Sequence, residues 1–224
     1  MNVLDKGYVK LLAIMGDDCT PATAARVSYG NEARGWDEGD GKLTAYLLDH
    51  GHMSPFEMVE MMWEVKAPIF VARQWVRHRT ANWNEFSMRY ADPGRIGTYG
   101  EVDYYTPAAF LGQSGVNKQS SGAPIEEQER ARRAYDNAHV AAIGAYESLV
   151  RLGVSREQAR AVLPVSVYTH WIWKCDLRNT LHFLELRDHD GAQEEIRAYA
   201  KAMIEMLHNA LPNLMDLWES RRSK

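Results

Sequence analysis

Arginine is concentrated in one short stretch of the chain, residues 73–90, which reads RQWVRHRTANWNEFSMRY. Arg73, Arg77, Arg79 and Arg89 all lie within it. A guanidinium presents a planar fork of N–H donors that matches two oxygens of a phosphate or a carboxylate. Because the stretch also contains Gln, His, Glu and Ser side chains, we expect it to form a site for a phosphorylated or otherwise anionic ligand.

The segments before the arginines predict a buried scaffold that positions them. Residues 58–66 alternate between apolar and polar side chains, with Lys66 on the polar side, which indicates a half-exposed strand. Pro68 is then expected to start a nearly all-apolar helix, IFVARQWV, which must be buried. The arginines therefore follow the end of a fixed element, as a pre-organised site requires.

The rest of the chain predicts an α+β protein with few strands and a helical second half. Further strands are expected at 8–15 and 165–175, and residues 112–124 read as a disordered loop. The expected helices are, in order, a short one from Pro21 and then 41–50, 124–152, one capped by Ser155, 177–187 and 192–211.

Composition excludes several classes of protein. The 224 residues carry a net charge of −4, so the molecule as a whole is a poor ligand for nucleic acid. Two cysteines far apart, Cys19 and Cys175, predict neither a disulfide framework nor a zinc-thiolate site. No apolar stretch approaches the 18 residues of a membrane span and no signal peptide is evident, so we expect a cytoplasmic protein.

Two other functions remain open from the residues alone. A metal phosphohydrolase acting on nucleotides would use the His50/His52 and His189–Asp190 pairs, but HEXXH is absent and no metal site is expected. An anion- or RNA-binding module would stack bases on Trp and Arg, which the negative net charge disfavours.

Neither nucleophilic catalysis nor a Rossmann fold is expected. Ser87 lacks a GxSxG context, and Cys175 lies in an apolar run where an inert thiol is usual. There is no GxGxxG and no P-loop, so any dinucleotide must be held in another way.

Several motifs in order resemble one known family. Arg77, His78 and Arg79, seven residues and then Ser87 make the pattern RHR(x)7S, the signature of flavin-dependent thymidylate synthases, the ThyX family. The segments GHMSPFE, AARVSYG and REQARAVLP also resemble the family, and the similarity covers roughly residues 4–210. We therefore expect residues 1–224 to form a single catalytic domain.

The resemblance implies a fold and an activity. The fold is α+β, with a mixed or antiparallel sheet flanked by helices. The activity is the conversion of dUMP to dTMP, with 5,10-methylenetetrahydrofolate as carbon donor and FAD, reduced by NADPH, as hydride donor. The family forms homotetramers whose active sites are shared between subunits.

The resemblance also implies roles for individual residues. Arg187 matches the arginine that activates the uracil. The positions that match dUMP-binding residues are Gln74, Arg77, Glu85, Phe86, Ser87, Met88, Arg89, Arg160 and Arg187. Those that match FAD-binding residues are Ser54, Arg77, His78, Arg79, Thr80, Glu85, Asp176, Arg178 and His182.

A few positions are weaker matches or depart from the family pattern. His52 and Tyr90 are expected neighbours of the folate or the flavin. The departures from the commoner residues are Met58, Asp176, His182 and Gly191.

Overall fold

The computed structural model describes residues 1–30, 35–116 and 120–222, and it is built on one five-stranded antiparallel sheet. The strand order is β1-β2-β3-β7-β4. The strands are β1 (Asn2–Val3), β2 (Gly7–Met15), β3 (Glu60–Pro68), β7 (Tyr168–Asp176) and β4 (Asn82–Glu85). The expectation of an α+β fold with an antiparallel sheet and helices around it is confirmed.

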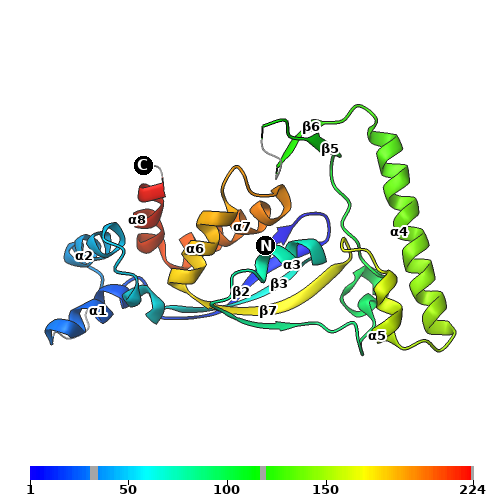
Figure 1. Ribbon diagram of the computed structural model, residues 1–224. Coiled ribbons are helices and arrows are strands. Elements are labelled where there is room, and N and C mark those ends of the chain that lie inside the picture. Colours follow the sequence, from blue (N-terminus) through cyan, green and yellow to red (C-terminus); the bar gives the residue numbers. More distant parts are fainter. Residues whose placement is uncertain (31–34, 117–119, 223–224) are drawn as a thin grey trace.

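Helices cover one face of this sheet, the upper face in Figure 1. They are α3 (Ile69–Trp75), α6 (Leu177–Arg187) and α7 (Glu194–Ala210). Trp75 of α3 lies at the centre of the core, with its ring 4.4 Å from that of Phe183 and 5.6 Å from that of Trp173. On the opposite face, Met15 and Met62 are partly exposed at 62% and 38%.

The remaining helices lie at the two ends of the sheet (Figure 1). At one end are α1 (Thr20–Arg26), α2 (Glu38–Asp49) and α8 (Pro212–Arg222), and at the other are α4 (Gln128–Arg151) and α5 (Arg156–Ala159). Short 3-10 turns connect them: Val27–Tyr29, Ser54–Met58, Pro93–Ile96, Thr98–Gly100 and Arg160–Val162. None of the described helices is both long and apolar enough to cross a membrane.

The expected alternation in β3 is confirmed with one exception. Met61, Trp63 and Val65 face the core and are at most 1% exposed. Lys66, expected on the exposed side, is buried instead, because its Nζ donates to Asp103 Oδ2 at 2.7 Å. A long-range partner of this kind leaves no local trace in the sequence.

Several expected boundaries were wrong. Pro68 ends β3 and α3 starts at Ile69, while the strand expected from residue 58 starts at Glu60. The helix expected from Pro124 starts at Gln128. Ser155 precedes α5 but makes no side-chain capping bond, and α5 has only four residues.

Five helices and strands were not expected. The arginine stretch contains β4, whose Trp83 ring stacks 4.5 Å from Trp171. The loop expected at 112–124 instead contains the two-stranded sheet of β5 (Leu111–Gln113) and β6 (Ser121–Pro124), while residues 117–119 lie outside the described part. The other two are β1, which precedes the strand predicted at 8–15, and α8, which follows the last helix that the sequence predicts.

The buried Lys66–Asp103 pair anchors the chain that leaves the arginine stretch. Asp103 Oδ2 also accepts from the backbone N and the hydroxyl of Thr98, at 2.9 and 3.0 Å. The backbone carbonyl of Asp103 accepts a hydrogen bond from the backbone N of Tyr168, at the start of β7. The pair therefore ties the 98–104 segment to the middle of the sheet.

Replacing Asp103 by Ala should lower the free energy of unfolding by about 3 to 5 kcal/mol, because Lys66 would keep a buried charge without a partner. Urea denaturation followed by circular dichroism measures the change. The double replacement Lys66→Met/Asp103→Ala should recover much of the loss. Glu38→Gln, which breaks the exposed pair between Glu38 and Lys42, is the matched control and should cost about 0.5 kcal/mol or less. Equal losses for Asp103→Ala and Glu38→Gln would contradict this account.

Candidate active site

A recess of about 360 Å³ opens where β7 runs into α6. Asp176, the last residue of β7, caps α6: its Oδ1 accepts from the backbone N of Asn179 at 2.8 Å. The capped helix ends at Arg187, so its length and starting point fix where that guanidinium lies. The recess is lined by Arg77, His78, Arg79, Thr80, Cys175, Asn179, His182, Leu186 and Arg187.

Arg187 is held in place by two contacts, one to the last turn of α3 and one to the segment that follows it. Its Nε donates to Nε2 of His78 at 3.0 Å, and one terminal nitrogen donates to the backbone carbonyl of Gln74 at 3.2 Å. The side chain of Gln74 in turn donates to Gln193. Burial lowers the pKa of Arg187, yet an arginine remains charged at neutral pH.

His78 is kept neutral by its surroundings. Burial is the main cause that lowers its pKa from 6.5 to about 4, and the positive charges of Arg187 and His182 add to it. Because Nε2 accepts from Arg187, the neutral ring carries its proton on Nδ1. One edge of the ring also lies against Phe183, 4.9 Å between centroids. His78 thus acts as a fixed acceptor that orients Arg187.

The recess is strongly cationic. Arg77 and Arg79 lie at its mouth with exposed side chains, and within the described residues neither takes part in an ion pair or a side-chain hydrogen bond. Guanidinium groups without acidic partners favour a ligand that carries phosphate or an anionic ring. The charge and the half-buried position of Arg187 therefore fit a phosphorylated nucleotide or dinucleotide.

The FAD positions inferred from the resemblance divide into three groups. Arg77, His78, Arg79, Thr80 and His182 line the recess, and Asp176 caps α6 at its edge. Arg178 lines a second cavity of about 800 Å³ that shares Thr80, Asn179 and His182 with the recess.

Besides Asp176, two of these positions line neither cavity. Ser54 starts the 3-10 turn that also carries Glu57, the partner of Arg178. Glu85 has both oxygens engaged on the sheet, by Thr169 Oγ1 at 2.7 Å and Trp83 Nε1 at 3.1 Å.

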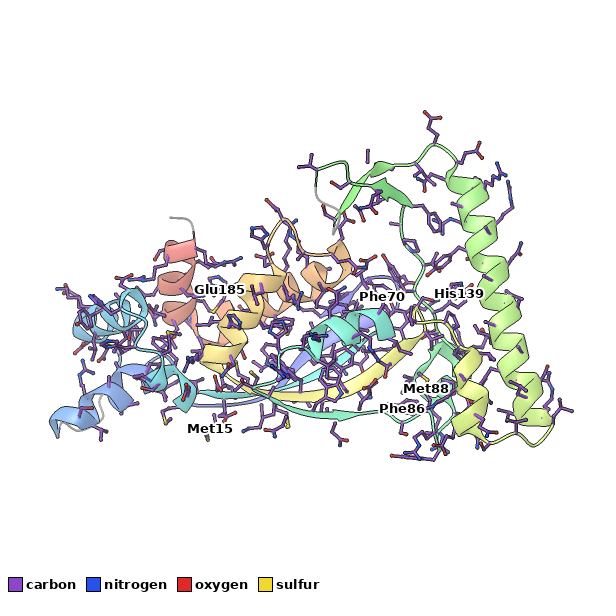
Figure 2. All side chains as sticks on the ribbon, in the orientation of Figure 1. Met15, Phe70, Phe86, Met88, His139 and Glu185 are labelled. Carbon is purple, nitrogen blue, oxygen red and sulfur yellow. The ribbon has the colours of Figure 1, made fainter. Side chains whose placement is uncertain are left out.

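Most of the dUMP positions lie away from the recess of the same chain. Phe86 and Met88 lie beside α5, at the other end of the sheet from Glu185 on α6 (Figure 2). Arg89 follows in the same segment and pairs with Glu157 of α5 at 2.9 Å. Three further residues are close in sequence either to Arg89 or to α5, and none of them lines the recess: Ser87, Tyr90 and Arg160. Within one chain, therefore, the RHR part of the RHR(x)7S pattern lines the recess, whereas its serine does not.

Other expected residues have simpler surroundings. His52 lies near Tyr46 and His50, with ring centroids 6.0 and 6.2 Å away.

The described residues contain no group of three His, Cys, Asp or Glu side chains that could hold a metal ion. Five tryptophans are too deeply buried to stack on bases, at 3% exposed or less: Trp63, Trp75, Trp171, Trp173 and Trp218.

Sequence reasoning missed three residues of the recess: Cys175, Asn179 and Leu186. Asn179 could have been placed from the sequence, because it follows the helix-capping residue Asp176 by three positions. Cys175 is buried, and burial raises the pKa of its thiol to about 12, so it stays protonated. A protonated thiol is a poor nucleophile, in line with the inert Cys175 that the sequence predicts.

The neutral His78 should make stability pH-dependent. Between its unfolded pKa of 6.5 and its folded value of about 4, the unfolded chain binds a proton that the folded chain does not. Lowering the pH from about 7 to about 5 should therefore destabilise the protein through His78, by about 1 kcal/mol after solvent screening of this half-buried group. His78→Gln, whose amide can still accept from Arg187, should flatten this part of the slope in urea denaturation. Identical slopes for the two proteins would contradict a neutral His78.

Comparisons with known proteins agree with this geometry. The Thy1 family profile, described as thymidylate synthase complementing protein, matches residues 10–213. A flavin-dependent thymidylate synthase of Thermus thermophilus is 48% identical over 213 residues, covering 94% of this chain and 74% of that protein. The enzyme of the same name from Treponema pallidum is 44% identical, covering 94% and 68%.

A solved structure is similar over nearly the whole chain. It is the UMP/dUMP methylase PolB of Streptomyces cacaoi bound with 5-Br dUMP, with a TM-score of 0.84 and 30% identity. The match covers 98% of this chain and 97% of that one. The profile, the relatives and the structure agree, and the chain belongs to the family of flavin-dependent thymidylate synthases.

Proposed function

We propose that this protein converts dUMP to dTMP by reductive methylation, with 5,10-methylenetetrahydrofolate as carbon donor and NADPH-reduced FAD as hydride donor. The observation that carries the proposal is Arg187, held by neutral His78 inside a cationic recess. The thymidylate synthases of Thermus thermophilus and Treponema pallidum support the reaction class.

Arg187 activates the pyrimidine. C5 of uracil is a weak nucleophile, and it gains electron density when N3 loses its proton or the neighbouring carbonyl becomes enolate-like. A guanidinium beside N3 stabilises that negative charge, and it does so more strongly in a recess partly shielded from water. With Nε committed to His78 and one terminal nitrogen bonded to the Gln74 carbonyl, the remaining N–H groups of Arg187 are the donors available to the ring. No enzyme nucleophile is needed, in accord with the protonated thiol of Cys175.

The residues around the recess fit an FAD. Arg77, Arg79 and Arg178 supply donors for its two phosphates, while Thr80, His78 and His182 border the ring system. Ser54, Glu85 and Asp176 complete the set inferred for the cofactor. When bound, FAD supplies the hydride that turns the transferred methylene into a methyl group. The chain itself orients the two reactants and shields them from water.

The dUMP phosphate is bound by Arg89 and Arg160, and the rest of the nucleotide by Gln74, Arg77, Glu85, Phe86, Ser87 and Met88. Because Arg89 and its neighbours lie apart from Arg187 in one chain, we infer that each active site combines the recess of one subunit with the Arg89 region of another. A homotetramer with shared active sites meets this requirement. His52 and Tyr90 are proposed neighbours of the folate or the flavin, and a cytoplasmic location stays a prediction.

A second substrate deserves a direct comparison, because PolB is described as a UMP/dUMP methylase. The relatives with higher identity are thymidylate synthases, which favours dUMP. Parallel assays with dUMP and UMP decide between them, and faster methylation of UMP would overturn the assignment.

The reaction is tested anaerobically with NADPH, dUMP and methylenetetrahydrofolate. We expect dTMP to form as the flavin is reoxidised. Arg187→Ala should retain FAD and the fold but lose at least about a hundredfold in dTMP formation, the scale of removing one transition-state donor. Arg187→Lys keeps the charge without the fork and serves as the graded control. Near-normal turnover by Arg187→Ala would refute its role.

Shared sites are tested by mixing two weakened variants. Arg187→Ala and Arg89→Ala protomers, unfolded together and refolded at equal amounts, should regain about a quarter of the wild-type sites if each site draws the two arginines from different subunits. Each variant refolded alone is the control. A mixture no more active than the average of its parents would show that both arginines act from one chain.

A further inference from the structure

The second cavity is larger than the recess and is closed on one side by the C-terminal helix. Its volume is about 800 Å³, and α8 forms that wall with Trp218, Arg221 and Arg222. Figure 1 shows α8 between α2 and α6. The indole of Trp218 donates to Glu185 of α6 at 3.2 Å, which fixes the width of the cavity there. None of the residues on the α8 wall belongs to the dUMP or FAD sets.

The cavity adjoins the recess. Thr80, Asn179 and His182 line both of them. A ligand in the cavity can therefore extend one end to the flavin that we propose for the recess. This inference rests on the proposed function, because it concerns the donor that reduces the flavin.

The α8 wall has one cationic group with donors to spare. Arg221 is saturated structurally, because its nitrogens donate to Asp49 and to the carbonyls of Ala45 and Leu217. Arg222 is different: it pairs with Asp188 through one terminal nitrogen alone, which donates to Oδ2 at 3.0 Å and to the backbone carbonyl at 3.3 Å, and its guanidinium lies over the ring of Trp218. Within the described residues its other nitrogens have no hydrogen-bond partner, so they remain available to a ligand.

The cavity combines ion-paired arginines with apolar side chains. Arg178, Arg222 and His189 bring N–H groups to its rim, whereas Leu48, Met53 and Leu181 provide apolar surface. Glu185 is the acid in the lining, and one of its oxygens is taken by Trp218. This arrangement fits a flat heteroaromatic base that carries a phosphate.

We infer that this cavity binds the adenosine end of NADPH, with Arg222 contacting the 2′-phosphate. The nicotinamide end then reaches the recess along the side formed by His182 and Thr80. The adenosine half of FAD is the competing occupant, but the FAD positions Arg178 and His182 belong to α6 and Thr80 precedes β4, whereas Arg222 belongs to α8.

The test compares NADPH with NADH, which lacks the 2′-phosphate, as reductants of the flavin in Arg222→Gln. Stopped-flow absorbance at the flavin band measures the half-saturating concentration of each. A charge-assisted hydrogen bond contributes about 1.5 to 3 kcal/mol, so we expect the value for NADPH to rise about tenfold or more while that for NADH stays unchanged. Arg222→Lys should lie between the wild type and Arg222→Gln.

Two further measurements separate the alternatives. FAD content and dTMP formation by dithionite-reduced Arg222→Gln should match the wild type. Arg151→Gln, which removes an exposed arginine from α4, is the matched control for net charge and should leave NADPH saturation unchanged.

Four results would overturn the inference. The inference fails if Arg222→Gln leaves the half-saturating concentration of NADPH unchanged. It also fails if the half-saturating concentrations of NADH and NADPH rise by the same factor. Loss of FAD would assign the cavity to the flavin's own adenosine half, and a raised half-saturation for methylenetetrahydrofolate alone would assign it to the folate tail. Failure of the proposed function itself is distinguishable, because wild-type enzyme reduced by dithionite would then form no dTMP.

Discussion

The structure depends on strand β7, which is hydrogen-bonded on both edges and continues directly into α6. Its pairing with β3 extends over nine residues, from Tyr168 to Asp176, and β4 pairs along its other edge. Asp176 then caps α6, so helix and strand share one fixed junction. A strand held on two sides cannot slide without breaking both ladders. The position of Arg187, at the far end of α6, follows from that junction.

The elements with a strong local pattern could be predicted from the sequence. The alternation around Trp63, the apolar run through Trp75 and the apolar face of residues 177–187 all correspond to observed elements. Where the prediction failed, the cause was non-local. Lys66 is buried only because Asp103 returns to it, and Asn82–Glu85 becomes a strand only because the free edge of β7 accepts it.

The recess was predictable in part. The signature led to Arg77, His78 and Arg79, and the resemblance added Arg187. What no sequence pattern conveys is that His78 and Arg187, 109 residues apart, form one hydrogen-bonded unit with a single protonation state. The same limit applies to Ser87 and Arg89, which are near Arg79 in sequence but lie elsewhere in the folded chain. Their separation is a property of the tertiary structure, and local spacing concealed it.

Phe183 contacts one residue of the hydrophobic core and one residue of the recess. One side of its ring packs on Trp75, in the centre of the core, and His78 lies against it from the recess. The wall of the recess and the core of the protein are therefore one packed layer. Substitutions that tighten or loosen this core also move the imidazole that aims Arg187. Stability and turnover cannot be adjusted independently here, and a search for more heat-resistant variants should leave Phe183 and Trp75 alone and work on the remote helix α4.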